Sequence, residues 1–151
     1  MARLTTLLRK SRADQRMLAL AAVLHVVVAI AVRVLPFGPV RRLLRHAAAL
    51  GPRPRDVDAV DVRVVQAVRT VASWLPGANC LTEALVAQCL LARYQHETTL
   101  CFGVARIRPA GRPFDAHAWL ERRGSGLIGV RAIVYDPLRP PSRCVSSPPS
   151  R

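Results

Sequence analysis

Hydrophobic residues follow a helical spacing through the first half of the chain. The first run, Met17 to Leu35, is almost wholly apolar and ends at residues 36–39, because proline removes a backbone donor and clashes with the preceding turn. A short basic helix is expected from Val40 to Leu50. After a break at 51–55, apolar residues return at three- and four-residue steps, which predicts an amphipathic helix with one buried stripe. The stripe consists of Val57, Val60, Val64, Val68, Val71 and Leu75.

A fourth helix and three strands are predicted in the second half of the chain. The helix is expected from about Cys80 to Tyr94, and Asn79 can cap it by accepting a hydrogen bond from a backbone N–H of the first turn. Beyond this helix the composition changes to that of strands. The expected strands are Thr98–Ala105, Ala116–Arg122 and Leu127–Tyr135. The pattern therefore predicts an α+β fold with an N-terminal helical arm (1–51), a core (52–138) and a Pro/Ser-rich tail (139–151).

The apolar run that ends at Leu35 is almost long enough to cross a bilayer, at about 1.5 Å per residue. Only the stretch from Met17 to Val32 lacks a full charge, which is short for a span. We expect a helix that is buried or faces a partner, with contact to a membrane surface and a true span as alternatives. No small-residue cleavage site of the A-x-A type follows the run, so we expect a cytoplasmic protein with reduced thiols.

The charge is strongly positive. The 151 residues, enough for one domain, carry 23 basic and 9 acidic side chains, for a net charge of +14. A basic protein that binds nucleic acid is one explanation, because clustered cations displace counterions from phosphate. However, 51% of the residues are hydrophobic and only 5% are aromatic, which fits neither a disordered basic tail nor a base-stacking surface. We therefore expect no nucleic-acid partner. No C-x-x-C pair occurs among the four cysteines, so no metal site is expected.

Two residues are candidates for catalysis. Cys80 is expected at a helix N-terminus, where partial positive charge favours a thiolate nucleophile. His117 lies on the second expected strand, with Trp119 and Glu121 on the same face. A helix that begins with cysteine and packs on an antiparallel sheet that carries histidine is the shared core of papain-like and transglutaminase-like cysteine proteases. The alternatives are a cysteine that only fills core volume and a structural histidine.

The other cysteines and histidines are expected to have no chemical role. Cys89 and Cys101 lie within apolar patterns and are expected to fill core volume. His46 follows a basic segment and His96 lies between a helix and a strand, so we expect both to be solvated. His25 is expected to be a tolerated residue of the apolar helix.

Three segments together resemble one protein family. The segments are NCLTEALVAQCLLARY (79–94), TLCFGVA (99–105) and AHAWLE (116–121). They closely resemble the stand-alone leader peptidases of lasso-peptide biosynthesis, the short transglutaminase-like B-two proteins, over roughly residues 52–130. The resemblance implies a cysteine protease that removes the leader from a ribosomally synthesised precursor peptide, with Cys80 as nucleophile and His117 as general base and without metal or cofactor.

The resemblance also implies partners. These are the leader of the precursor peptide, a separate small leader-recognition protein and an asparagine-synthetase-like macrolactam synthetase. The apolar and basic helices of the arm are expected to dock this recognition protein or a membrane surface.

The third catalytic residue departs from the family pattern. The family usually places an aspartate about a dozen residues after the histidine, where this chain has Gly129. With a two-residue turn at 124–125, His117 pairs opposite Ala132, and no carboxylate is adjacent. Asp136 follows the superfamily's order and is the predicted orienting acid if the strand bulges or the turn is longer. A Cys–His dyad and a non-catalytic scaffold of the same biosynthetic complex are the alternatives.

Overall fold

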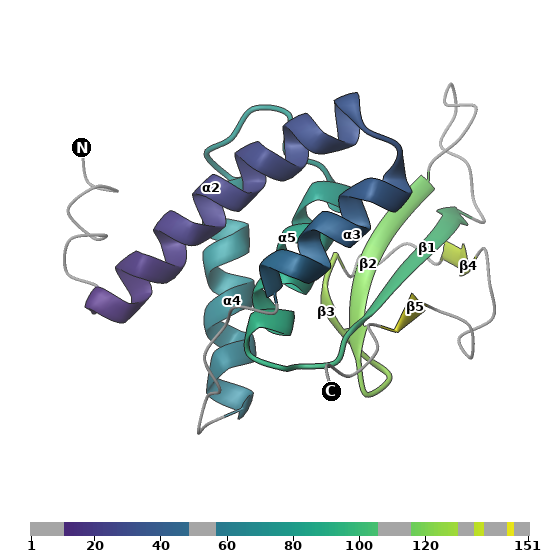
Figure 1. Cartoon of the computed structure of the whole chain (residues 1–151). Helices are drawn as coiled ribbons and strands as arrows, with labels where there is room; N and C mark the ends of the chain where they lie inside the picture. Colours follow the sequence, from purple (N-terminus) through teal and green to yellow (C-terminus); the bar gives the residue numbers. More distant parts are fainter. Residues whose placement is uncertain (1–10, 49–56, 106–115, 130–134, 138–144, 147–151) are drawn as a thin grey trace.

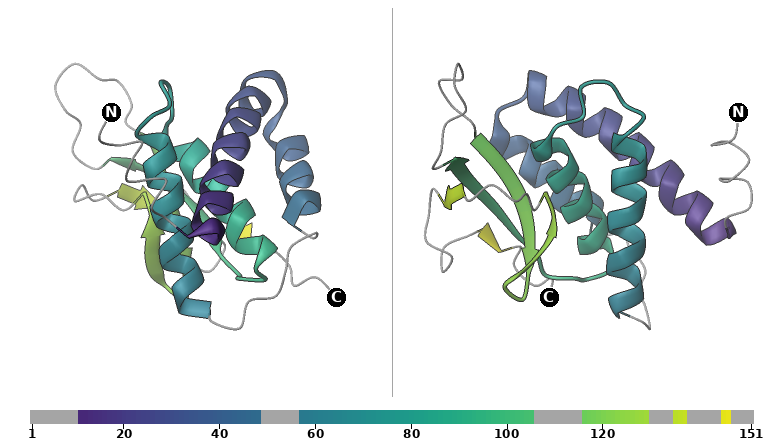
Figure 2. Two further views of the ribbon diagram at one scale, coloured as in Figure 1. Left: turned by 90° about the vertical axis from the view of Figure 1, so that its left-hand side faces the viewer. Right: turned by 180° about the vertical axis from the view of Figure 1, so that it is seen from behind.

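The protein has the α+β architecture that the sequence predicts. The computed structural model describes residues 11–48, 57–105, 116–129, 135–137 and 145–146. In this part of the chain, four helices lie on one side of an antiparallel sheet (Figures 1 and 2). The predicted domain boundary at residue 51 and most of the predicted tail lie outside the described residues.

The two helices of the N-terminal arm pack on the rest of the domain. Helix α2 spans Arg12–Val34, and the Ser11 side chain caps it by accepting a hydrogen bond from the Asp14 N–H. Helix α3 spans Phe37–Ala48 and therefore begins three residues before the predicted start at Val40, because Pro39 is tolerated in the first turn of a helix. The buried side chains of α2 lie in one core cluster with those of α4 and α5. They are Leu18, Ala21, Val28 and Ala31, and His25 on the same face of the helix is also buried.

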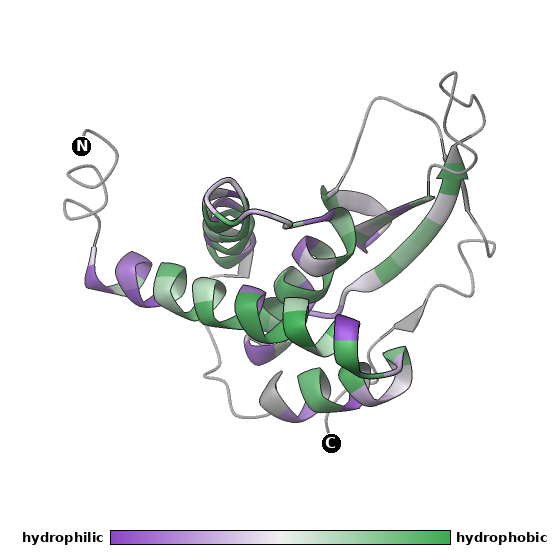
Figure 3. Ribbon diagram, turned by 90° about the horizontal axis from the view of Figure 1, so that it is seen from above, coloured by the Kyte–Doolittle hydropathy of each residue, from purple (hydrophilic) through white to green (hydrophobic). Residues whose placement is uncertain are grey.

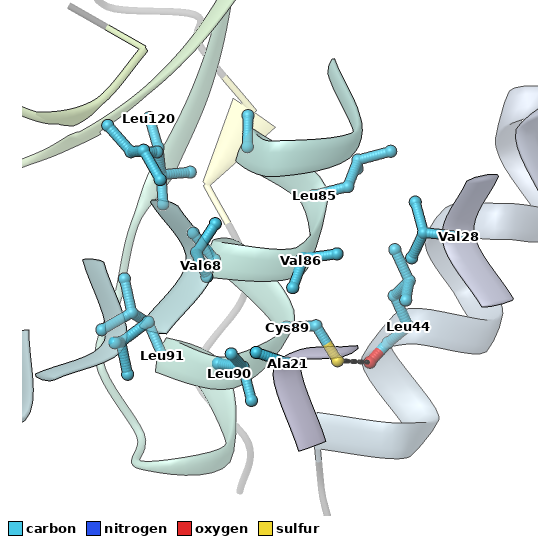
Figure 4. Close-up of a cluster of buried hydrophobic side chains, with 14 of the residues drawn as sticks. Ala21, Val28, Leu44, Val68, Leu85, Val86, Cys89, Leu90, Leu91 and Leu120 are labelled. Atoms are coloured by element: carbon cyan, nitrogen blue, oxygen red, sulfur yellow. Dashed lines mark hydrogen bonds between the residues drawn. The ribbon is translucent and has the colours of Figure 1, made fainter. Parts of the chain in front are cut away.

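Helix α5 is the centre of the core. It spans Cys80–Arg93 and contacts α2, α3, α4 and the sheet, which explains why it is apolar on all sides (Figure 4). Helix α4 spans Val57–Ala72, and Val64, Val68 and Val71 of its predicted stripe are buried. Cys89 is also buried in this core, as expected, with its Sγ 3.7 Å from the Leu44 carbonyl oxygen. Burial raises the pKa of this thiol to about 11.

Within the described residues, five strands form the sheet. They are β1 (Thr99–Ala105), β2 (Ala116–Arg122), β3 (Ser125–Ile128), β4 (Tyr135–Pro137) and β5 (Val145–Ser146). The order is β3-β2-β1-β4, and β5 also pairs with β1. Leu120 on β2 lies between Leu100 on β1 and Ile128 on β3, and all three side chains are buried in the core cluster.

The third predicted strand is wrong in its extent. The sequence predicts a continuous strand over Leu127–Tyr135, but β3 begins at Ser125 and ends at Ile128, and 130–134 lie outside the described residues. The turn before β3 is Arg123-Gly124, with φ values of 52° and 76°, and not the expected 124–125 pair. Both residues are left-handed, as a two-residue hairpin turn that matches the strand twist requires. An irregularity between Leu120 and Glu121 then shifts the register of β3.

A buried polar cluster joins α4 to the sheet. Asp61 on α4 has one carboxylate oxygen 2.6 Å from Nδ1 of His96, and its other oxygen accepts a hydrogen bond from Arg122 on β2. The expectation that His96 is solvated is therefore wrong: the side chain is buried because it has a carboxylate partner inside the fold. His46 is exposed, as expected.

Candidate active site

Cys80 begins α5 at a well-defined helix start. The Asn79 side chain accepts a hydrogen bond from the Thr82 N–H at 3.0 Å, and the Asn79 N–H donates to the Thr82 hydroxyl at 3.0 Å. This reciprocal pair is a capping box, so the predicted cap is confirmed. A helix start has four N–H groups without a partner inside the helix. The capping box satisfies those of Asn79 and Thr82, and the remaining two belong to Cys80 and Leu81.

Cys80 is the accessible thiol among the described cysteines. Its side chain is partly exposed, whereas Cys89 and Cys101 are buried, as their apolar surroundings in the sequence predict. Cys144 lies outside the described residues. A thiol that reacts with a large substrate has to be reachable from solvent, so Cys80 is the candidate nucleophile in the described part of the chain.

His117 is held by a backbone carbonyl. It is the second residue of β2, is buried, and makes a hydrogen bond through Nε2 with the carbonyl oxygen of Gly129. A carbonyl oxygen only accepts, so Nε2 carries the proton. In the neutral ring, Nδ1 is therefore the nitrogen with the lone pair, which is the atom that can take a proton from a thiol.

Two other residues of β2, Trp119 and Glu121, form a chain of contacts that begins at His117. The ring of His117 is stacked with that of Trp119, with the centroids 6.4 Å apart and the planes at 17°. The indole N–H of Trp119 donates to a carboxylate oxygen of Glu121 at 2.7 Å. The predicted common face of these three residues is consistent with both contacts. The carboxylate of Glu121, on the same strand as His117, is thus bonded to the indole.

Gly129 stands where the resemblance predicts an aspartate, and the fold leaves no room there for a side chain. Its φ is +78°, and a Cβ atom would lie 2.8 Å from the carbonyl oxygen of Ala118 and 3.1 Å from Cα of Trp119. The main chain after β3 therefore approaches β2 closely enough for a carbonyl to reach His117. Side-chain patterns in the sequence do not reveal this partner, because it is a backbone carbonyl, although a glycine at a strand end is a signal of close backbone approach.

The backbone of Asp136 lies two strands away from that of His117. Asp136 on β4 pairs with Val104 of β1, which pairs on its other side with Ala116, the residue before His117. At about 4.8 Å between neighbouring strands, the backbones of Asp136 and Ala116 are roughly 10 Å apart. The side chain of Asp136 lies outside the described part of the structure, so its role as orienting acid stays a prediction.

The fold brings the elements of Cys80 and His117 together at one end. Helix α5 packs against β2, and the N-terminal ends of both elements lie at the upper end of the domain in Figure 1. No hydrogen bond between the two side chains occurs in the described ranges. Catalytic hydrogen bonds are often long in a substrate-free enzyme, so the pairing of these two groups stays a prediction.

The described residues contain no group of three or more His, Cys, Asp or Glu side chains that could hold a metal ion. In the comparison with known protein families, the model of the transglutaminase-like superfamily matches residues 6–136. No curated protein and no solved structure matches the chain. Because the matched segment covers most of the sequence and includes Cys80, His117 and Gly129, the chain belongs to the transglutaminase-like superfamily.

Proposed function

We propose that this protein is a cysteine peptidase that removes the leader from a ribosomally synthesised lasso-peptide precursor. The superfamily commonly includes cysteine proteases. The observation that carries the proposal is that a thiol and an imidazole lie on two elements, α5 and β2, that pack together at one end of the fold. Cys80 is a partly exposed thiol at a capped helix start, and His117 has its tautomer fixed by the Gly129 carbonyl.

The proposed reaction begins with transfer of the Cys80 proton to Nδ1 of His117. The thiolate then attacks the scissile carbonyl carbon, and the negative oxygen of the tetrahedral intermediate accepts hydrogen bonds from the N–H groups of Cys80 and Leu81. The imidazolium returns its proton to the leaving amine, which is the new N-terminus of the core peptide. Water, activated by His117, then hydrolyses the thioester and releases the leader as a carboxylate, which restores the free thiol.

The partners of this reaction are part of the proposal. We propose that a separate small recognition protein delivers the leader, and that an asparagine-synthetase-like macrolactam synthetase uses the freed amine. If the purified chain cleaves the precursor equally fast with and without the recognition protein, the proposed dependence on delivery is wrong, whereas the peptidase activity itself stands.

The test of the peptidase is cleavage of the precursor encoded beside this gene, with the recognition protein present, followed by mass spectrometry. We expect Cys80→Ala to abolish cleavage and the control Cys101→Ala, which removes a buried thiol, to retain it. Thermal unfolding of both variants shows whether they fold. Undiminished cleavage by a folded Cys80→Ala variant would contradict the proposal.

The proposed pairing of Cys80 with His117 has its own test. If the two groups pair in solution, His117→Ala slows alkylation of Cys80 by iodoacetamide near neutral pH by about tenfold or more, because the imidazole no longer stabilises the thiolate. His46→Ala, which removes an exposed histidine, is the control. Equal alkylation rates in wild type and His117→Ala would show that Cys80 acts without His117.

A non-catalytic scaffold with the same fold is the second candidate. It is favoured by Gly129, because the position that is acidic in the family has no side chain here. A scaffold binds the precursor or its partners but never turns the precursor over. Single-turnover cleavage at enzyme concentrations above that of the precursor separates the two candidates, since a weak peptidase still gives product under these conditions.

A further inference from the structure

The outer face of α2 carries an exposed apolar stripe, which we call the α2 stripe. Its members are Val23, Val26, Val27, Ile30 and Val34, which are 60%, 48%, 42%, 56% and 72% exposed. At about 100° per residue, all five lie within roughly a third of the helix circumference. This third is opposite the buried face that contains Ala21 and Val28. Helix α2 is therefore apolar on two sides, only one of which the domain covers.

The α2 stripe lies in the part of the structure that holds most of the exposed large hydrophobic residues. Of the ten large hydrophobic residues that are exposed in the described ranges, eight lie on α2, on α3 or between them. The eight are the five stripe residues together with Leu35, Phe37 and Leu43. Single exposed hydrophobic residues need no explanation, but a contiguous group marks an interaction surface. Figure 3 shows the length of α2, with a hydrophilic N-terminal end followed by a hydrophobic stretch.

Exposed arginines lie at both ends of the α2 stripe. Arg12 and Arg16 are exposed and continue the line of the stripe toward the N-terminus at four-residue steps, and Arg33 is exposed near its other end. The acidic residue of the N-terminal end, Asp14, is half-buried and pairs with Arg63 of α4 at 3.6 Å. The stripe therefore presents an aliphatic centre with positive charge at both ends, on a chain of net charge +14.

We propose that α2 lies flat on an anionic lipid bilayer, with the α2 stripe among the acyl chains and the arginines on the headgroups. By length and composition α2 is also able to cross a membrane. Crossing, however, would strip its inner face from α4 and α5 and expose the core, so the outer face docks while the inner face stays packed. The cations favour an anionic surface, because the negative potential of such lipids attracts basic residues near the membrane.

The chemistry of the stripe favours lipid over a protein partner. Protein interfaces are enriched in tyrosine, tryptophan and arginine at their centres, where hydrogen bonds give specificity. The centre of the α2 stripe is valine and isoleucine without one hydrogen-bonding side chain. Acyl chains require only apolar area, which is what this face offers.

The test is flotation of the full chain with lipid vesicles. We expect the wild type to float with phosphatidylglycerol vesicles and much less with phosphatidylcholine vesicles. The double substitution Val27→Asp, Ile30→Asp should reduce the bound fraction about tenfold or more. The matched control is Val62→Asp on α4, which is 57% exposed but lies outside the surface and should bind like wild type. Similar melting temperatures of the two variants show that both are folded.

A second variant separates charge from apolar insertion. Arg12→Gln with Arg16→Gln should weaken binding to phosphatidylglycerol vesicles and leave the weak binding to phosphatidylcholine unchanged. The proposal is overturned if the wild type floats with neither lipid, or if the double aspartate variant floats as well as Val62→Asp. It is also overturned if the wild type is a dimer that does not float and the aspartate variant is a monomer, because the stripe is then an interface between copies.

Discussion

His117 donates a hydrogen bond from Nε2 to the carbonyl oxygen of Gly129, twelve residues further along the chain. The bond fixes the tautomer of the imidazole and the orientation of its ring, which are two of the tasks of the acid in a cysteine-protease triad. A carbonyl has no full negative charge, so it stabilises the imidazolium less than a carboxylate does. The proposed peptidase is therefore a Cys–His dyad with a backbone orienter, and we expect it to be slower than enzymes with a complete triad.

Substitution of Gly129 tests this arrangement. Gly129→Ala places a Cβ 2.8 Å from the Ala118 carbonyl oxygen at a φ of +78°, so the main chain has to move away from β2. We expect a loss of about 1–3 kcal/mol in the free energy of unfolding and a strong loss of cleavage, because His117 loses its acceptor. The control is Gly38→Ala, whose Cβ meets nothing within 4 Å. Urea unfolding and precursor cleavage are the measurements, and equal behaviour of the two variants would contradict the tight contact.

Asp136 is the orienting acid that the sequence predicts, and Asp136→Asn decides its role. Loss of a carboxylate that stabilises the catalytic imidazolium lowers kcat by about 10⁴ in a complete triad. Because Gly129 already accepts the Nε2 hydrogen bond, we expect a loss of less than about tenfold. The measurement is kcat for precursor cleavage. A loss approaching that of a complete triad would assign the orienting role to Asp136.

Cys89 makes the stability of the protein depend on pH above neutrality. Burial raises the pKa of its thiol from 9.0 to about 11, while Arg93 lowers it by a smaller amount. The unfolded chain therefore loses this proton near pH 9 and the folded protein only near pH 11, so stability falls as the pH rises between these values. A difference of this size between the folded and unfolded pKa values corresponds to about 2–3 kcal/mol in the free energy of unfolding.

We expect Cys89→Ala to lose less stability than the wild type over this pH range, because the substituted side chain does not titrate. Urea unfolding across the range measures the difference. If both proteins show the same decrease above pH 9, another group causes it.

The cluster of Asp61, His96 and Arg122 predicts a large effect on stability. Asp61→Asn removes the charge that two buried partners share, so we expect a loss of about 3–5 kcal/mol in the free energy of unfolding. The control Asp14→Asn breaks a more exposed pair with Arg63, at 3.6 Å, and should cost about 0–1 kcal/mol. Chemical denaturation of both variants is the test. Equal losses would mean that the buried cluster adds no more than a surface pair.

Local sequence patterns were sufficient for the helices, the first two strands and the position of Cys80. The spacing of Val64, Val68 and Val71 predicts the buried face of α4, and Asn79 predicts the start of α5, because both signals lie within one or two turns of chain. The type and turn of the hairpin after β2 depend on single residues, Arg123 and Gly124, which explains the one-residue error there.

What the sequence alone determined is thus the presence of the four helices and the first two strands, and it named Cys80 and His117 as the candidates for catalysis. Tertiary structure decided which groups bond to one another across the fold. The bonds of His117 to Gly129, of His96 to Asp61 and of Arg122 to Asp61 join positions 12, 35 and 61 residues apart. Such contacts leave no local periodicity, and a backbone carbonyl has no side chain by which to recognise it. Only the close approach of β3 to β2 made a glycine the partner of the candidate catalytic base.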